Sequence, residues 1–239
     1  MNYASVFRQN VFGAAALGLA AFTPLPALAG QIFASNMALP YGMTVQLAGG
    51  VLGSASSLAG QQILTVNNGS TYNAGGLYTL AAWCIDFPHH INIGSMAIDF
   101  TVGVLTDDHY GSNPATSNPL TPSQAQRIGG LVRYGNAQMA LTPSNLLSAA
   151  IQAAIWNIEY GSHYSGSDLS LQTAITSLEA LAPSLSTTGA QTLNSFYAGS
   201  NEYKFQSLEI YVPEPMTISV MAIGLLGLAA VRRRHRPEA

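Results

Sequence analysis

The chain has 239 residues, only 8% of them charged, and a formal net charge of −3. It therefore has few of the Lys and Arg clusters that binding to nucleic acid or anionic lipid requires. Residues 30–212 carry three basic and nine acidic side chains, a net charge of −6, so nucleic acid is not expected as a partner. Their length suits one domain with a hydrophobic core of its own.

The first 29 residues have the order of features that marks a secretory signal peptide. Arg8 supplies a positive charge, a short apolar run covers residues 11–22, and Ala27-Leu28-Ala29 places small residues where a signal peptidase cleaves. The run is too short to span a membrane, and prolines end it. We therefore predict an exported chain whose mature part begins at Gly30.

Short, partly alternating segments separated by Gly, Asn and Ser predict strands in the first half of the mature part. They are residues 31–35, 43–47, 62–66, 77–87 and 96–105, and residues 204–212 return to a strand. A first helix is predicted over 121–134 and is ended by Gly135-Asn136. A second runs from Thr142-Pro143-Ser144 to Gly161, a third covers 168–181, and a fourth covers 190–197. This order predicts an α+β domain over residues 30–212, a β-sandwich or barrel with an inserted helical block.

The last 27 residues, 213–239, combine three features in a fixed order. Pro213-Glu214-Pro215 precede an apolar stretch over 216–231, and Arg232, Arg233 and Arg234 follow at once. The stretch is slightly short of the roughly 20 residues of a spanning helix, but arginines that reach back to the interface extend it. The arginine cluster would stay on the cytoplasmic side, so the tail is predicted to be a membrane helix with the rest of the chain outside.

This tail resembles the PEP-CTERM sorting signal of Gram-negative bacteria. The resemblance implies handling by an exosortase, a membrane protease that processes such tails, and an association with exopolysaccharide production. It places the protein in the cell envelope or at the cell surface, anchored to the membrane at least transiently. An ordinary single-span anchor is the alternative.

Cys84 is the single cysteine of the chain, at the end of a predicted buried strand. An exported protein with one cysteine cannot form a disulfide within its chain. Its thiol is therefore buried and inert, paired between molecules, or reactive.

Two segments resemble the thioester domains of bacterial surface adhesins. Trp83-Cys84-Ile85-Asp86 is similar to that family's cysteine segment, and Gln152, in the sequence Ile-Gln-Ala-Ala-Ile-Trp that ends at Trp156, is similar to its glutamine segment. Residues 127–135 also look like the helix that precedes the glutamine in that family. The departure is Ile151, where the family has Thr, next to the residue that would react.

The resemblance implies an internal thioester between Cys84 and Gln152 that an amine or hydroxyl of an external protein or polysaccharide could open. Trp83 and Trp156 would keep water from the bond, and Asp86 would shuttle protons or hold the strand end, unless it is a solvated acid. Such a protein reacts once, so no enzyme activity and no cofactor are expected. Lys204 is the only lysine, which suits a protein carrying an amine-reactive group.

Three other readings of the same residues are weaker, and one non-reactive alternative remains. The histidines lack the spacing of a metal site, no protease signature surrounds Cys84, and Asp107-Asp108 lack the regular spacing of a calcium loop. No metal is therefore predicted. The alternative is a structural or exopolysaccharide-associated envelope protein in which the Cys84 thiol is buried and unreacted.

Overall fold

The computed structural model describes residues 31–68, 78–85, 87, 93–103, 120–194 and 207–211. The predicted signal peptide, sorting tail and Asp86 lie outside these residues and stay predictions. No helix within the described residues is long and apolar enough to cross a membrane.

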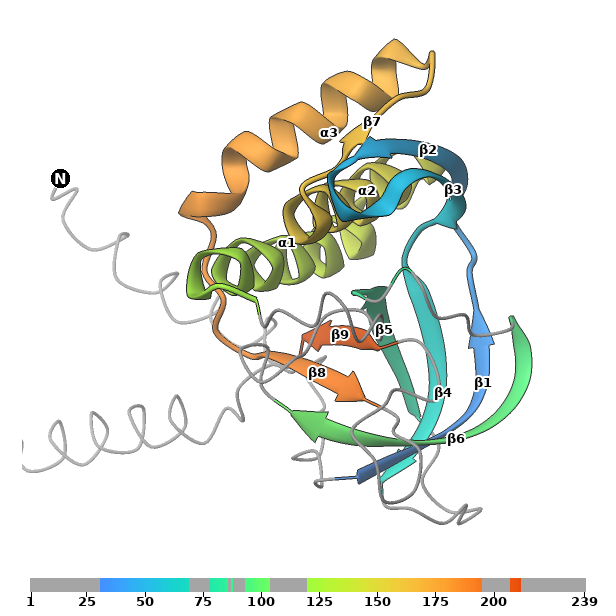
Figure 1. The fold of residues 1–239 in the computed structure, drawn as a ribbon. Helices are drawn as coiled ribbons and strands as arrows, with labels where there is room; N and C mark the ends of the chain where they lie inside the picture. The colour runs from blue at the N-terminus through green and yellow to red at the C-terminus, as the bar shows by residue number, and fades with distance from the viewer. Residues whose placement is uncertain are drawn as a thin grey trace, which may run out of the picture. The chain divides into compact units, whose positions relative to one another are not determined.

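Six antiparallel strands close into a barrel in the order β1-β4-β5-β9-β8-β6 (Figure 1). Closure pairs every strand on both sides and leaves no sheet edge. Apolar side chains such as Leu64, Leu80 and Phe100 are buried in it. The strands are β1 (Gln31–Ala38), β4 (Gln62–Asn68), β5 (Tyr78–Cys84), β6 (Gly94–Gly103), β8 (Ala190–Asn194) and β9 (Leu208–Tyr211).

A second, three-stranded sheet is formed by a hairpin inserted between β1 and β4. The hairpin strands β2 (Met43–Gly49) and β3 (Gly53–Ala59) are joined by the short 3-10 helix η1 (Gly50–Leu52), and β7 (His163–Tyr164) pairs with β2. Glycines at 49, 50 and 53 supply the positive φ angles of this turn, 77°, 58° and 68°. Neither β3 nor β7 was predicted from the sequence.

Between β6 and β8 the described residues form three α-helices, in line with the inserted helical block that the sequence predicted. They are α1 (Pro122–Leu141), α2 (Asn145–Tyr160) and α3 (Leu169–Leu181), followed by the 3-10 turn η3 (Ala182–Ser184). The predicted helix starts are confirmed by their caps, because the side chains of Thr121, Ser144 and Asp168 each accept a hydrogen bond from a backbone amide in the first turn.

Helix α2 is the central helix of this block. It packs against both α1 and α3, while α1 lies against β5, β8 and β9 (Figure 1). Every residue of α2 from Ser148 to Tyr160 is buried, so this helix has no solvent-facing side beyond its first turn. A polar residue on α2 must therefore find its hydrogen-bond partner inside the protein.

Two helix predictions were wrong. Helix α1 does not end at Gly135 but continues to Leu141, because Gly135 serves packing rather than termination. A Cβ at Gly135 would lie 2.7 Å from Cζ2 of Trp83, so the helix can approach the barrel there only with glycine. Residues 190–194 form β8 between β6 and β9 rather than the start of a helix, because the barrel's pairing outweighs the short local pattern.

The role of Gly135 can be tested through the sign of a stability change. Helix propensity alone predicts that Gly135→Ala stabilises the protein by about 1 kcal/mol. The contact with Trp83 predicts a net loss of stability instead, because overpacking a core lowers the free energy of unfolding by about 1–3 kcal/mol. Urea unfolding of Gly135→Ala should therefore give a lower midpoint than wild type. Ala137→Gly, at an exposed position of the same helix, measures the propensity term alone, and a raised midpoint for Gly135→Ala would contradict the packing account.

Candidate functional site

The side-chain amide of Gln152 on α2 lies directly against Cys84 at the end of β5. The Cys84 backbone N–H donates to Oε1 of Gln152 at 2.9 Å, and Nε2 of Gln152 donates to the Cys84 carbonyl oxygen at 2.7 Å. Both residues are 1% exposed. The predicted pair, 68 positions apart in the chain, is thus in contact, and the carboxamide plane is fixed on the residue that carries the thiol.

Strand pairing explains why a side chain can occupy this place. The residues on either side of Cys84 face β9: Trp83 is opposite Glu209, and the Ile85 N–H donates to the Ser207 carbonyl at 3.1 Å. The backbone groups of successive residues point to opposite sides of a strand, so those of Cys84 face the side of β4. Pairing with β4 stops two residues earlier, where Gln62 is opposite Ala82. The Gln152 amide takes the hydrogen-bonding position that β4 leaves open.

Other polar residues on the same face of α2 hold the helix in this register. Ser148, one turn before Gln152, accepts a hydrogen bond from the Gln61 N–H at 2.7 Å and donates to the Tyr41 carbonyl at 2.9 Å. Asn145, three residues before Ser148, accepts a backbone N–H from the turn before β2 at 3.1 Å. Residues spaced by three and four lie along one side of a helix. This row of side chains therefore fixes how α2 is placed along its axis, and with it the point at which Gln152 contacts β5.

Trp83 is held beside the site by an amide on α1. Its indole Nε1 donates to Oδ1 of Asn136 at 2.8 Å, and the same oxygen accepts a hydrogen bond from Nε2 of Gln61 at 2.7 Å. Trp83 is fully buried, as its predicted role in excluding water requires. Neither Asn136 nor Gln61 was predicted to belong to the site. The sequence pattern placed Asn136 at a helix end, where its side chain would have no such contact.

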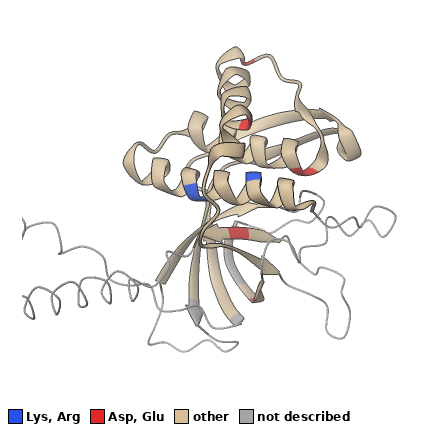
Figure 2. Cartoon of the chain, turned by 90° about the vertical axis from the view of Figure 1, so that its left-hand side faces the viewer, with Lys and Arg blue, Asp and Glu red and all other residues tan. Residues whose placement is uncertain are grey.

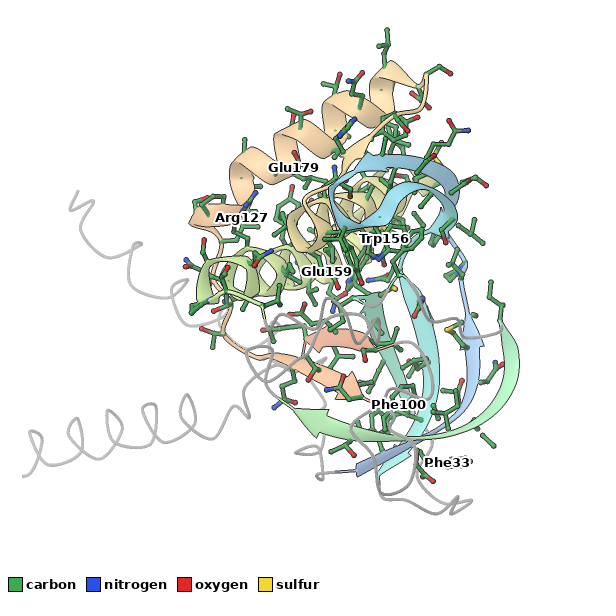
Figure 3. The ribbon with its side chains drawn as sticks, viewed as in Figure 1. Phe33, Phe100, Arg127, Trp156, Glu159 and Glu179 are labelled. Atoms are coloured by element: carbon green, nitrogen blue, oxygen red, sulfur yellow. The ribbon has the colours of Figure 1, made fainter. Side chains whose placement is uncertain are left out.

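Trp156 follows Gln152 by four residues on α2 (Figure 3). It is 2% exposed, and its ring meets that of Phe87 edge to face, with centroids 4.8 Å apart and planes at 82°. The Phe87 N–H donates to the Tyr160 hydroxyl at 3.0 Å, so the segment after Cys84 is tied to the end of α2. The two predicted tryptophans are therefore both buried, Trp83 next to Cys84 on β5 and Trp156 one turn after Gln152 on α2.

Of the residues considered for other chemistry, the described part of the chain includes His163. His163 is in β7, paired with Ala48 of the second sheet, while His89, His90, His109, Asp107 and Asp108 lie outside the described residues. Within the described ranges, no group of three or more His, Cys, Asp and Glu side chains is placed to hold a metal ion.

The arrangement is suited to attack by the Cys84 thiol on Cδ of Gln152. The Cys84 N–H already donates to Oε1, the oxygen on which negative charge would develop during that attack. A hydrogen bond aimed at a developing oxyanion is a principal means of stabilising acyl transfer. In the serine proteases, likewise, the backbone N–H of the nucleophilic residue contributes to the oxyanion hole.

Comparisons with known proteins place the chain at a distance from them. No protein-family model matches the chain, and no match was found among the curated proteins. Among solved structures, the chain is similar to the N-terminal thioester domain of a protein F2-like fibronectin-binding protein from Streptococcus pneumoniae. The identity is 13% and the TM-score 0.41, with 80% of this chain and 99% of that chain covered.

Asn136 should matter as an acceptor for two buried donors. Asn136→Ala would leave Nε1 of Trp83 and Nε2 of Gln61 without that acceptor, and each buried group left unsatisfied costs about 1–3 kcal/mol. We expect a clear loss of stability in urea unfolding. Asn136→Asp keeps the acceptor oxygen and should recover most of the loss, whereas equal losses in the two variants would show that the hydrogen bonds are not the cause.

Proposed function

We propose that the chain is an exported surface protein in which Cys84 and Gln152 form an internal thioester, and that this bond attaches the protein covalently to an external amine or hydroxyl. The observation that carries the proposal is the pair of hydrogen bonds, 2.9 and 2.7 Å, between the Gln152 carboxamide and the backbone of Cys84. They hold the electrophilic carbon between Oε1 and Nε2 against the one residue with a thiol.

The formation step balances without a cofactor. The Cys84 sulfur attacks Cδ of Gln152, and the charge that develops on Oε1 is stabilised by the Cys84 N–H. The bond from Cδ to Nε2 breaks, and Nε2 leaves as ammonia with the thiol proton. An amide is a poor electrophile, but fixed neighbours can act at effective concentrations on the order of 10⁵–10⁸ M.

Burial supports the survival of such a bond. The two partners are each 1% exposed, and Trp83 and Trp156 are 0% and 2% exposed. Excluding water from an active site prevents hydrolysis of reactive intermediates. A nucleophile must therefore reach the bond through a local opening, which favours a bound target over solvent.

The distribution of charge also fits an amine-reactive protein. The chain contains a single lysine, Lys204, which lies outside the described residues, and the two basic residues of the described part, Arg127 and Arg133, are both on α1 (Figure 2). Guanidinium groups stay protonated and are not nucleophiles at neutral pH. Residues 30–212 thus offer the thioester one lysine amine of their own at most.

Opening by an amine would form a bond from its nitrogen to Cδ of Gln152 and break the bond from Cδ to the Cys84 sulfur, which takes up the displaced proton. The product is a stable amide, so each molecule reacts once and no enzyme turnover is expected. The predicted signal peptide and the tail that resembles a PEP-CTERM signal would place this domain outside the cell. An exosortase-type protease would process the tail, with one end of the chain held in the envelope.

A non-reactive envelope protein is the second candidate, because the same hydrogen bonds satisfy the Gln152 amide whether or not the bond forms. In that case the contact would contribute to stability only, at about 1 kcal/mol for each hydrogen bond. The two candidates differ by one covalent bond and one ammonia.

Trypsin offers a direct test, since Cys84 precedes Arg127 and Gln152 follows Arg133. Cleavage at both arginines separates the two partners into different peptides. We expect mass spectrometry of the full chain, digested under non-reducing and mildly acidic conditions, to find these peptides joined and lighter by one ammonia. Methylamine treatment before digestion should separate them and leave a methylamide on Gln152.

Cys84→Ala and Gln152→Ala are the matched controls, and each should abolish both the joined peptides and the mass deficit. Separate peptides with the calculated masses in the wild-type protein, together with alkylation of Cys84 after denaturation, would instead support the non-reactive protein.

A further inference from the structure

We propose that the indole N–H of Trp156 is the second hydrogen-bond donor to the Gln152 carbonyl oxygen when the thioester forms and when a nucleophile opens it. This assigns a chemical role to a residue predicted only to exclude water. The inference rests on the proposed function, and it concerns the transition state of the same site.

The two tryptophans differ in how their polar atoms are satisfied. Nε1 of Trp83 donates to Asn136, whereas Nε1 of Trp156 is buried without a hydrogen-bond partner in the described part of the chain. Buried tryptophans usually find an acceptor for the indole N–H, and an unsatisfied one in a native protein calls for an explanation. A donor that is used only in the transition state would have no acceptor in the unreacted protein, which is what the structure shows for this N–H.

The position of Trp156 places the indole at the reacting pair. It follows Gln152 by four residues on α2, and helical side chains lean toward the N-terminus, over the preceding turn. Its ring also meets Phe87, which follows Cys84 by three residues. Helical spacing and the Phe87 contact thus place the indole near the turn that carries Gln152 and next to Phe87, three residues after Cys84.

A second donor would stabilise the negative charge that develops on Oε1 of Gln152 in the transition state. Among the described residues, the donor to Oε1 of Gln152 is the Cys84 N–H at 2.9 Å. When an amine attacks Cδ of the thioester, the carbonyl electrons move onto this oxygen. They return as the bond from Cδ to sulfur breaks, and the displaced proton goes to the Cys84 thiolate. Oxyanion holes commonly present two donors to the oxygen that gains charge.

Trp156→Phe separates the role of hydrogen-bond donor from that of excluding water, because the phenyl ring stays apolar but lacks the N–H. In the full chain, we expect methylamine to open the thioester about 10- to 1000-fold more slowly than in wild type, the upper range being that of known oxyanion-hole donors. The melting temperature should change little through hydrogen bonding, since this N–H has no partner in the described structure. A faster opening would instead indicate a role in shielding only and would overturn the proposal.

Two further proteins keep the test decisive. Benzothienylalanine at position 156 retains the bicyclic shape and lacks the N–H, so it should show the same slowing even if Phe leaves a cavity. Tyr164→Phe removes one aromatic polar group in β7, where the hydroxyl accepts the Asp168 N–H at 3.3 Å, and should leave the opening rate unchanged.

The failures of the two proposals are distinguishable. A wild-type protein with a thioester, and a benzothienylalanine protein that opens at the wild-type rate, would overturn the donor role and leave the proposed function standing. A wild-type protein with no thioester would overturn both.

Discussion

Two hydrogen bonds between the Gln152 carboxamide and the backbone of Cys84 join the helical block to the barrel at the point where β4 stops pairing with β5. A buried amide must be satisfied, and here a single residue satisfies both of its ends. The rest of the site follows from this constraint. Ser148 fixes the register of α2, and Trp83 and Trp156, on the two elements that carry the pair, are both buried.

The sequence was most informative where a residue's chemistry is rare in the chain. The single cysteine drew attention to Cys84, the resemblance of its segment to thioester domains singled out Gln152, and capping residues located the starts of all three helices. The strand-helix-strand order also predicted a β-sandwich or barrel with an inserted helical block, and the topology shows that it is a barrel.

The parts that were missed depend on contacts between distant segments. Gly135 suggests a helix end locally, but the Trp83 ring requires a glycine there, and α1 continues past it. Asn136 becomes an acceptor only because that continuation brings it to Trp83 and Gln61. Residues 190–194 are a strand because β6 and β9 flank them. No local pattern carries such information.

The central claim is that the contact between Cys84 and Gln152 is a covalent bond in the exported protein. A high-resolution crystal structure of that protein tests it most directly. The account predicts continuous electron density and a bonding distance from the Cys84 sulfur to Cδ of Gln152, with Nε2 lost as ammonia. An intact carboxamide that still donates to the Cys84 carbonyl, beside a separate thiol, would contradict it.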